Sequence, residues 1–228
     1  MRLKNDEHIF SEEMDRRSIS YLVHFTKAIN LIGIFQQEKL LSCDALDEAS
    51  ELCPDLYMED YIKHNDSIRL DHRRSHINLS VQFPNNFLFK RFQEADADGE
   101  WAVLLLSREV VRWEGTLFSV YNAAAASSRQ YGIGGSLDHF KNLFLDPIDI
   151  QYHWGKRSYA REGLRNCYPT SAQAEVLVQD SIAASQIKEV CFKSKHALSH
   201  WKSALQTVDL EQGVEMTVRP EFWGSERR

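Results

Sequence analysis

The stretch of sequence that decides the fold is YLVHFTKAINLIGIF, which occupies residues 21–35. Residues 21–25 have the composition of a strand, and apolar residues then recur at helical spacing from 27 to 37, with Thr26 placed as the N-cap. Alternate side chains of a strand share a face, so His24 and Thr26 lie together, opposite the apolar side chains of the strand. An imidazole and a hydroxyl on one face can hydrogen-bond a ribose hydroxyl or an amide. The alternative is a histidine at the edge of the core and a threonine that only caps the helix.

The rest of the chain reads as short strands with a few helices. Residues 1–19 form a polar lead-in, and residues 20–228 form one domain without an internal repeat or a linker. The early helix, the many short strands and the late helix predict an α+β fold. Strands are expected at 77–83, 101–107, 116–120, 174–179, 188–192 and 215–219, helices near 12–17, 136–145 and 195–206, and helix or loop at 44–60.

Composition narrows the class of protein. The chain has 228 residues, 43% of them hydrophobic, with a net charge of −6 and a mean hydropathy of −0.43. This hydrophobic content is enough to fill a core, and the negative net charge argues against strong non-specific binding to a polyanion. No apolar run is long enough to span a bilayer and the N-terminus has no signal-peptide pattern, so we expect a cytoplasmic protein without membrane contact. The four cysteines lack metal-site spacing, so we expect reduced thiols and no metal.

A carboxylate and an amide are spaced two residues apart in the strand expected at 174–179. Alternation places Gln173 and Glu175 on one open face and their apolar neighbours in the core. A fixed anion in this position suits ribosyl chemistry, because positive charge develops on the sugar as a leaving group departs from C1′. The glutamine could then orient an acceptor. The alternative is a polar strand that faces solvent.

A run of small residues, YNAAAASS at 121–128, follows another expected strand. Small side chains let a ligand approach the backbone, and Asn122 can bind that ligand or cap a helix. The alternative is an ordinary alanine-rich helix.

Taken in order, four segments resemble the DarT-like DNA ADP-ribosyltransferases, which are toxins of bacterial toxin–antitoxin modules. The segments are YLVHFTKAINLIGIF, INLSVQFPNNFLF, LFSVYNAAAAS and SAQAEVLVQDSI, and the similarity runs from about residue 20 to about residue 222. The resemblance implies an ADP-ribosyltransferase-like α+β fold, with a central, split, mostly antiparallel sheet flanked by helices. It implies NAD as the co-substrate and a nucleobase as the acceptor.

The resemblance also implies roles for particular residues. Glu175 and Arg69 match the catalytic positions, although Arg73 or Arg74 could take the place of Arg69. The residues expected to bind NAD are His24, Phe25, Thr26, Asn30, Arg69 and Asn122. The residues expected to contact the acceptor are Gln173, Lys156, Arg157, Arg161 and Arg165, and the aromatic residues that could stack on bases are Tyr131, Tyr152, Trp154 and Tyr159. The basic residues could equally be an ordinary solvated face.

The expected acceptor is single-stranded DNA, because the reacting edge of a base is inaccessible in a duplex. The FPN sequence at 83–85 resembles the guanine-modifying branch of the family, so guanine is favoured over thymine. The partner that the resemblance implies is a macrodomain ADP-ribosyl hydrolase, acting as the antitoxin. Three alternatives stay open: an RNA or protein acceptor, a non-catalytic module that binds NAD or ADP-ribose, and a structural domain.

Overall fold

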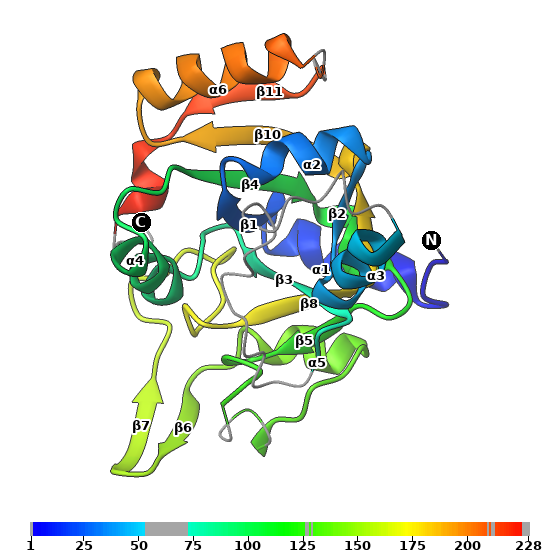
Figure 1. Cartoon of the computed structure of the whole chain (residues 1–228). Helices are drawn as coiled ribbons and strands as arrows, with labels where there is room; N and C mark the ends of the chain where they lie inside the picture. The colour runs from blue at the N-terminus through cyan, green and yellow to red at the C-terminus, as the bar shows by residue number, and fades with distance from the viewer. Residues whose placement is uncertain are drawn as a thin grey trace.

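A seven-stranded sheet runs through the chain in the order β11-β10-β4-β1-β3-β8-β5 (Figure 1). The computed structural model describes residues 2–52, 73–125, 128, 130–208, 210 and 213–224. The strands of this sheet are β1 (Tyr21–Lys27), β3 (His76–Val81), β4 (Trp101–Ser107), β5 (Leu117–Ser119), β8 (Glu175–Gln179), β10 (Ile187–Phe192) and β11 (Glu215–Val218). Neighbouring strands are antiparallel except β10 and β11, which are parallel and joined through a helix.

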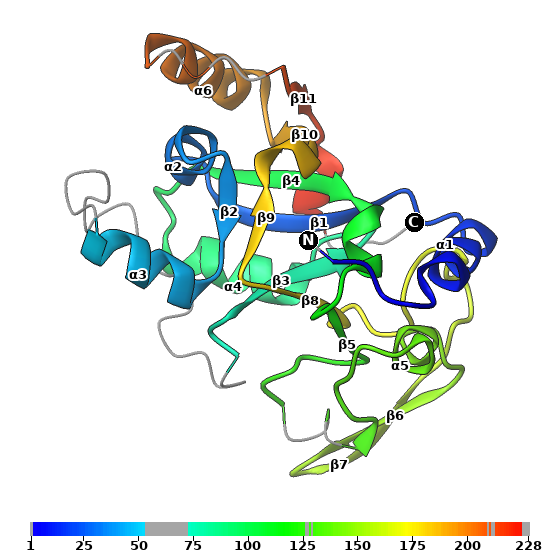
Figure 2. The same cartoon turned by 90° about the vertical axis from the view of Figure 1, so that its right-hand side faces the viewer.

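Smaller ribbons and α-helices surround this sheet. β2 (Lys39–Leu41) pairs with β9 (Ser181–Ala183), and β6 (Ile148–Tyr152) forms a hairpin with β7 (Gly155–Tyr159). The hairpin extends away from the sheet in both views (Figures 1 and 2). The helices are α1 (Glu7–Arg16), α2 (Asn30–Gln36), α3 (Cys43–Leu52), α4 (Asn86–Ala95), α5 (Leu137–Asn142) and α6 (Lys195–Thr207), and short 3₁₀ turns lie at Arg108–Arg112, Ala184–Gln186 and Pro220–Trp223.

The large sheet is split between β1 and β3. β1 pairs with β4 over seven residues, from Tyr21 opposite Ser107 to Lys27 opposite Trp101. On its other edge it pairs with β3 at only two positions, Leu22 with Val81 and Val23 with Ser80. The two strands therefore separate at His24, and β3 continues as the partner of β8.

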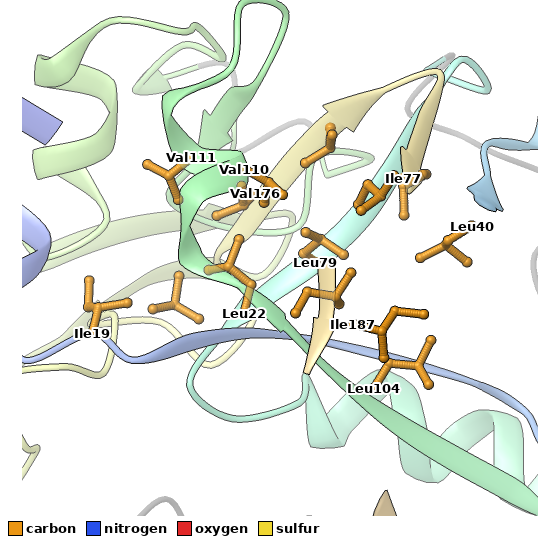
Figure 3. Packing of buried hydrophobic residues seen from close by; sticks show 14 of the residues in the cluster. Ile19, Leu22, Leu40, Ile77, Leu79, Leu104, Val110, Val111, Val176 and Ile187 are labelled. Atoms are coloured by element: carbon orange, nitrogen blue, oxygen red, sulfur yellow. The ribbon is translucent and has the colours of Figure 1, made fainter. Parts of the chain in front are cut away.

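Both faces of the sheet are covered by apolar side chains. The larger cluster includes Leu22, Leu79, Leu104 and Val176 from four strands, with Val110 from the 3₁₀ turn that follows β4 (Figure 3). The smaller cluster lies around Val23, Phe89 and Trp101. Leu22 and Val23 are adjacent in β1 and belong to different clusters, which is what alternation along a strand requires. Both faces of β1 are therefore packed at its first residues.

The segment expected to be a polar lead-in is part of this core. Phe10 and Met14 of α1 are fully buried, and Ile19 is 1% exposed. Leu3 forms a β-bridge with Trp113, which ties the start of the chain to the turn after β4. Residues 1–19 therefore pack into the same core as the rest of the chain, and the boundary expected at residue 20 does not separate them from it. Apolar residues one turn apart give α1 a buried face despite its charged composition.

The elements expected from hydropathy agree with the structure over most of the chain. The six strands predicted after residue 76 correspond to β3, β4, β5, β8, β10 and β11, and the late helices to α5 and α6. The stretch 44–60 is helical as far as Leu52, and its remainder lies outside the described residues. The hairpin β6–β7, the ribbon β2–β9 and helix α4 were not expected. No helix within the described ranges is long and apolar enough to cross a membrane.

Candidate active site

Glu175 is held by two hydrogen-bond donors from different parts of the chain. It is the first residue of β8, opposite Ser119 of β5, and it is 4% exposed. Its Oε2 accepts from the backbone N–H of Ala123 at 2.8 Å, and its Oε1 accepts from Nδ2 of Asn78 at 3.4 Å. Because both neighbours donate, the position is built for an acceptor-only group, which an ionised carboxylate is. The alternative of a polar strand that faces solvent is wrong at this residue, since Glu175 is buried.

His24 lies on the other side of the split and contacts the same asparagine. Its Nδ1 is 3.0 Å from the backbone carbonyl oxygen of Asn78. The ring occupies the place where β1 and β3 stop pairing, so a side chain rather than a backbone amide reaches that carbonyl. Asn78 thus joins His24 and Glu175, through its carbonyl on one side and its amide on the other. In the sequence Asn78 belongs to an expected strand, and no local pattern indicated a role for it.

The side chain of Asn78 also leaves a buried acceptor unused. Its Nδ2 is directed to Glu175, and its Oδ1 has no hydrogen-bond partner among the residues that the structure describes. Buried acceptors of this kind are normally satisfied by water or by a ligand. The site therefore offers one carboxylate and one free amide oxygen side by side to a group that carries hydroxyl donors.

Thr26 and Asn30 interact directly, but not as a helix cap. β1 continues to Lys27, and the N-cap of α2 is Ile29 without a side-chain cap, so the prediction that Thr26 caps the helix is wrong. Instead, Thr26 Oγ1 accepts from Nδ2 of Asn30 at 2.8 Å. The hydroxyl hydrogen of Thr26 is then left to donate. Strand pairing with β4 carries the chain past Thr26, which local helical spacing could not reveal.

Phe25 lies between these polar residues in sequence, and its ring has an apolar environment. It stacks on Phe89 with centroids 4.5 Å apart and also contacts Phe92 and Trp101. The structure therefore gives the Phe25 ring a packing contact in the smaller cluster.

Asn122 shapes the turn that presents a backbone amide to Glu175. Its Oδ1 accepts from the N–H of Ala124 at 2.8 Å, and its carbonyl accepts from the N–H of Ala125 at 2.9 Å. This local pattern is a turn closed by an asparagine side chain. It aims the N–H of Ala123 at the carboxylate, and residues 126, 127 and 129 lie outside the described part of the chain.

Gln173 is the start of a chain of hydroxyl groups. Its Nε2 donates to the hydroxyl of Tyr121 at 2.6 Å. The hydroxyl oxygen of Tyr121 lies 2.8 Å from that of Tyr152, and the hydroxyl oxygen of Tyr152 lies 2.7 Å from that of Tyr159. We call Tyr121, Tyr152 and Tyr159 the tyrosine chain. Burial raises the pKa of Tyr152 and Tyr159, so these two hydroxyls stay protonated at neutral pH. Two members of the chain were expected to stack on bases, and their hydrogen bonds were not expected.

The arginines expected near the diphosphate or the acceptor fall into two situations. Arg69 lies outside the described residues. Arg74 pairs with Asp44 at 3.0 Å and also with Asp47, both on α3. Those acidic residues pair with the Arg74 guanidinium, and the choice among Arg69, Arg73 and Arg74 as the active-site arginine stays a prediction.

The basic run expected to contact the acceptor is divided by the structure. Lys156 and Arg157 are exposed on β7, where Lys156 pairs with Asp149 at 2.7 Å and Arg157 lies over the Tyr159 ring at 4.9 Å. Arg165 is exposed in the loop that follows. The guanidinium of Arg161 instead donates to the loop itself, at the carbonyls of Tyr168, Arg165 and Asn166 and at the Thr170 hydroxyl.

The three segments singled out in the sequence therefore meet at one place. The strand with His24, the strand with Glu175 and the turn with Asn122 are joined through Asn78 and the N–H of Ala123. In the part of the chain that is described, no group of three or more His, Cys, Asp or Glu side chains could hold a metal ion. What the site offers is a buried anion with hydrogen-bonding groups on both sides.

The split, mostly antiparallel sheet flanked by helices is the fold of an ADP-ribosyltransferase. A family model described as "ssDNA thymidine ADP-ribosyltransferase, DarT" matches residues 23–223. The chain belongs to this DarT family of ADP-ribosyltransferases. The predictions of the family, of the α+β fold with a split sheet and of this class of enzyme are confirmed.

Solved structures with the same fold include chains from Thermus sp. 2.9 and from Thermosipho africanus. Thermus sp. 2.9 DarT in complex with NAD+ is 14% identical, with a TM-score of 0.56, and the match covers 90% of this chain and 98% of that one. The same protein in complex with ADP-ribosylated ssDNA has a TM-score of 0.58 at 13% identity, over 91% and 97% of the two chains. Thermosipho africanus DarTG in complex with ADP-ribose has a TM-score of 0.52 at 14% identity, over 90% of this chain and 51% of that one. No curated protein matches. DarT proteins bind NAD+ as co-substrate, in agreement with the expected co-substrate.

Proposed function

We propose that this chain transfers ADP-ribose from NAD to a base of single-stranded DNA, with guanine as the first candidate and thymine as the second. The observation that carries the proposal is the link from His24 through Asn78 to Glu175. It brings a ring that can hold a dinucleotide next to a buried carboxylate that can stabilise a ribosyl cation. Membership of the DarT family supports the DNA acceptor.

The residues at the split fit a ribose-containing co-substrate. Asn78 Oδ1 is a buried acceptor without a partner in the described part, and the Thr26 hydroxyl has a hydrogen to donate. His24, Thr26 and Asn30 would hold NAD, whose bound form supplies the ADP-ribosyl group and nicotinamide as the leaving group. A sensor that only binds ADP-ribose would not need a carboxylate fixed by two donors.

Glu175 would act at the reacting carbon. As the bond to nicotinamide weakens, positive charge develops on the ribose, and a carboxylate already fixed by Ala123 and Asn78 stabilises that charge without reorganising. The same carboxylate can accept a hydrogen bond from the 2′-hydroxyl. Gln173, two residues earlier and hydrogen-bonded to Tyr121, would orient the acceptor base.

The preference for guanine rests on resemblance. In the structure, Phe83 of the FPN sequence packs against Tyr168 and Phe222, and Asn85 caps α4 by accepting from the N–H of Leu88. These contacts explain why the segment folds as it does and do not read a base. A direct assay is therefore needed, with four oligonucleotides that each contain one base type within an otherwise unreactive strand.

That assay tests the proposed function. We expect a mass gain of one ADP-ribosyl unit on the guanine oligonucleotide when it is incubated with protein and NAD. A gain on the thymine oligonucleotide would correct the base, while labelled ADP-ribose appearing on RNA or protein pools and on no DNA would overturn the acceptor. If the protein neither transferred ADP-ribose nor consumed NAD, the chain would be a non-catalytic module that binds NAD or ADP-ribose.

Exposed basic side chains should contribute to DNA binding by neutralising phosphates. For a variant in which Lys156, Arg157 and Arg165 are replaced by Ala, we expect the slope of log Kd against log salt to fall by about 0.7 for each phosphate that these side chains neutralise in the wild type. Fluorescence anisotropy with a labelled oligonucleotide measures this slope.

Arg161 provides the comparison, because its guanidinium is used by the loop. Arg161→Ala should lower the melting temperature and leave the salt slope near that of the wild type. An unchanged slope in the triple variant, or a smaller slope in Arg161→Ala at an unchanged melting temperature, would contradict this division of the basic residues.

The toxin role and its partner extend the proposal. A toxin that modifies DNA would act in the cytoplasm, and a macrodomain ADP-ribosyl hydrolase would reverse its product. The Thermosipho africanus DarTG chain supports this pairing, because about half of it lies beyond the matched region and it was solved with ADP-ribose. We expect expression of the chain to arrest bacterial growth, co-expression of such a hydrolase to relieve the arrest, and Glu175→Gln to be harmless alone.

A further inference from the structure

The tip of the β6–β7 hairpin carries an exposed aromatic pair. Trp154 is 62% exposed, and its ring lies on that of Tyr152 with centroids 4.7 Å apart and planes 12° from parallel. The hairpin stands away from the large sheet in both views (Figures 1 and 2). A large indole is costly to leave in water, and here one of its faces is already covered by another ring. What remains accessible is a flat surface of the size of a base.

The surroundings of this pair are basic in an otherwise acidic protein. Arg157 lies over the ring of Tyr159 on the same hairpin, and Lys156 is exposed beside it. Between residues 148 and 165 the basic side chains outnumber the acidic ones, whereas the whole chain has a net charge of −6. A flat aromatic surface next to exposed cations suits a single nucleic-acid strand, since bases stack and phosphates pair with the cations.

Tyr152 connects the aromatic pair to the active site. Its ring supports Trp154, and its hydroxyl belongs to the tyrosine chain that ends at Gln173, two residues from Glu175. An amide N–H can only donate, so the hydroxyl of Tyr121 accepts from Gln173, and in its contact with Tyr152 either hydroxyl can be the donor. The position of the aromatic pair is thereby fixed relative to the residue that precedes the catalytic carboxylate.

We propose that Trp154, stacked on Tyr152, is a platform for an unpaired base of the acceptor strand that flanks the base being modified. This inference rests on the proposed function, because it takes the acceptor to be a single strand. The platform would hold the strand on the hairpin while another base of the same strand reaches Glu175. Stacking on one aromatic side chain accounts for a gain in affinity of roughly 10-fold to 100-fold.

The test reads stacking directly. An oligonucleotide of about twelve nucleotides carries 2-aminopurine at one position at a time, and its fluorescence is quenched when that base stacks on an aromatic ring. With the wild-type protein we expect quenching at one flanking position, and in Trp154→Ala we expect that quenching to disappear and the Kd to rise about 10-fold to 100-fold. Trp154→Phe should restore most of both.

Two matched variants separate the platform from other effects. Phe87→Ala removes a second exposed aromatic side chain, 72% exposed on α4, and should leave quenching and affinity unchanged. Tyr152→Phe keeps the supporting ring and removes the hydroxyl, so quenching at the flanking position should persist.

Several outcomes would overturn the platform. The platform would be overturned if the quenching seen with the wild type persisted in Trp154→Ala. It would also be overturned if Trp154→Ala changed the KM for the twelve-nucleotide acceptor and the KM for a dinucleotide by the same factor. A loss of binding to a partner protein in Trp154→Ala with oligonucleotide affinity unchanged would overturn it as well. Failure of the proposed function is distinguishable, since the wild type would then bind and quench the oligonucleotide without modifying it.

Discussion

Glu175→Gln is expected to reduce ADP-ribosyl transfer about 10³-fold while NAD still binds. The side chain that replaces the carboxylate has the same size and the same position at the start of β8. It lacks the charge that, in the proposed mechanism, stabilises the cation formed as nicotinamide departs. An interaction that strengthens only in the transition state affects turnover and not ground-state binding.

The hydrogen bonds around Glu175 sharpen this expectation. Both carboxylate oxygens accept, one from the N–H of Ala123 and one from the amide of Asn78. A glutamine can offer only one acceptor, so its own NH₂ group must face one of these donors. We therefore expect Glu175→Gln to lower the free energy of unfolding by about 1–3 kcal/mol as well, the usual cost of a buried donor without a partner.

Single-turnover transfer to the oligonucleotide and isothermal titration with NAD measure the two effects separately. Glu189→Gln is the matched control, because Glu189 is also a buried strand glutamate, 8% exposed, in the same sheet. It lies on β10, separated from β8 by three strands, and it pairs with Arg219. That variant should lose stability and keep the turnover of its folded fraction. Near-normal transfer in Glu175→Gln would remove Glu175 from the mechanism.

The strands that carry the site could be predicted from the sequence because their signal is local. Alternation of apolar residues identifies β1 and β8 without any knowledge of their neighbours, and it correctly places Ala174, Val176 and Val178 in the core. It could not show that Leu177, on the other face of β8, is buried as well. That face is covered by segments distant in sequence, which is why Glu175 was expected to be more open than it is.

The groups that join the site depend on strand register and not on local pattern. Asn78 reaches Glu175 because β3 pairs with β8, with Asn78 opposite Leu177, and because β1 separates from β3 at His24. The tyrosine chain and Gln173 bring together residues up to 52 positions apart. Neither arrangement produces a periodic pattern in a single sequence, so these contacts could be identified only from the three-dimensional structure.

The distribution of charged residues in the sequence did not show which charged side chains are buried, and two segments illustrate this. Arg161 belongs to a basic run and was expected to meet the acceptor, yet burial lowers its pKa and its guanidinium is used by backbone carbonyls. The N-terminal segment was expected to be a lead-in because it is rich in charged residues, yet two of these, Glu13 and Arg17, pair at 2.6 Å with little exposure. A composition average does not show which charged side chains cover apolar surface.

Phe10→Ala is expected to destabilise the whole protein, because α1 is part of its core. The Phe10 ring is fully buried and lies 5.9 Å from that of Phe118 and 5.8 Å from that of Phe140, centroid to centroid. Removing a buried phenyl ring loses its transfer free energy and leaves a cavity, at a cost of about 3–5 kcal/mol. Domains of this kind are stable by only about 5–15 kcal/mol, so much of the margin would be lost.

Urea unfolding followed by circular dichroism measures this cost, provided that the slope of the free energy against urea stays the same in both proteins. Phe87→Ala is the matched control, since its side chain is 72% exposed and its loss should change the free energy of unfolding by less than about 0.5 kcal/mol. The contrast between two phenylalanine truncations isolates burial from side-chain chemistry. If Phe10→Ala cost no more than Phe87→Ala, the first nineteen residues would be a dispensable lead-in, and the split sheet would hold Glu175 in place without them.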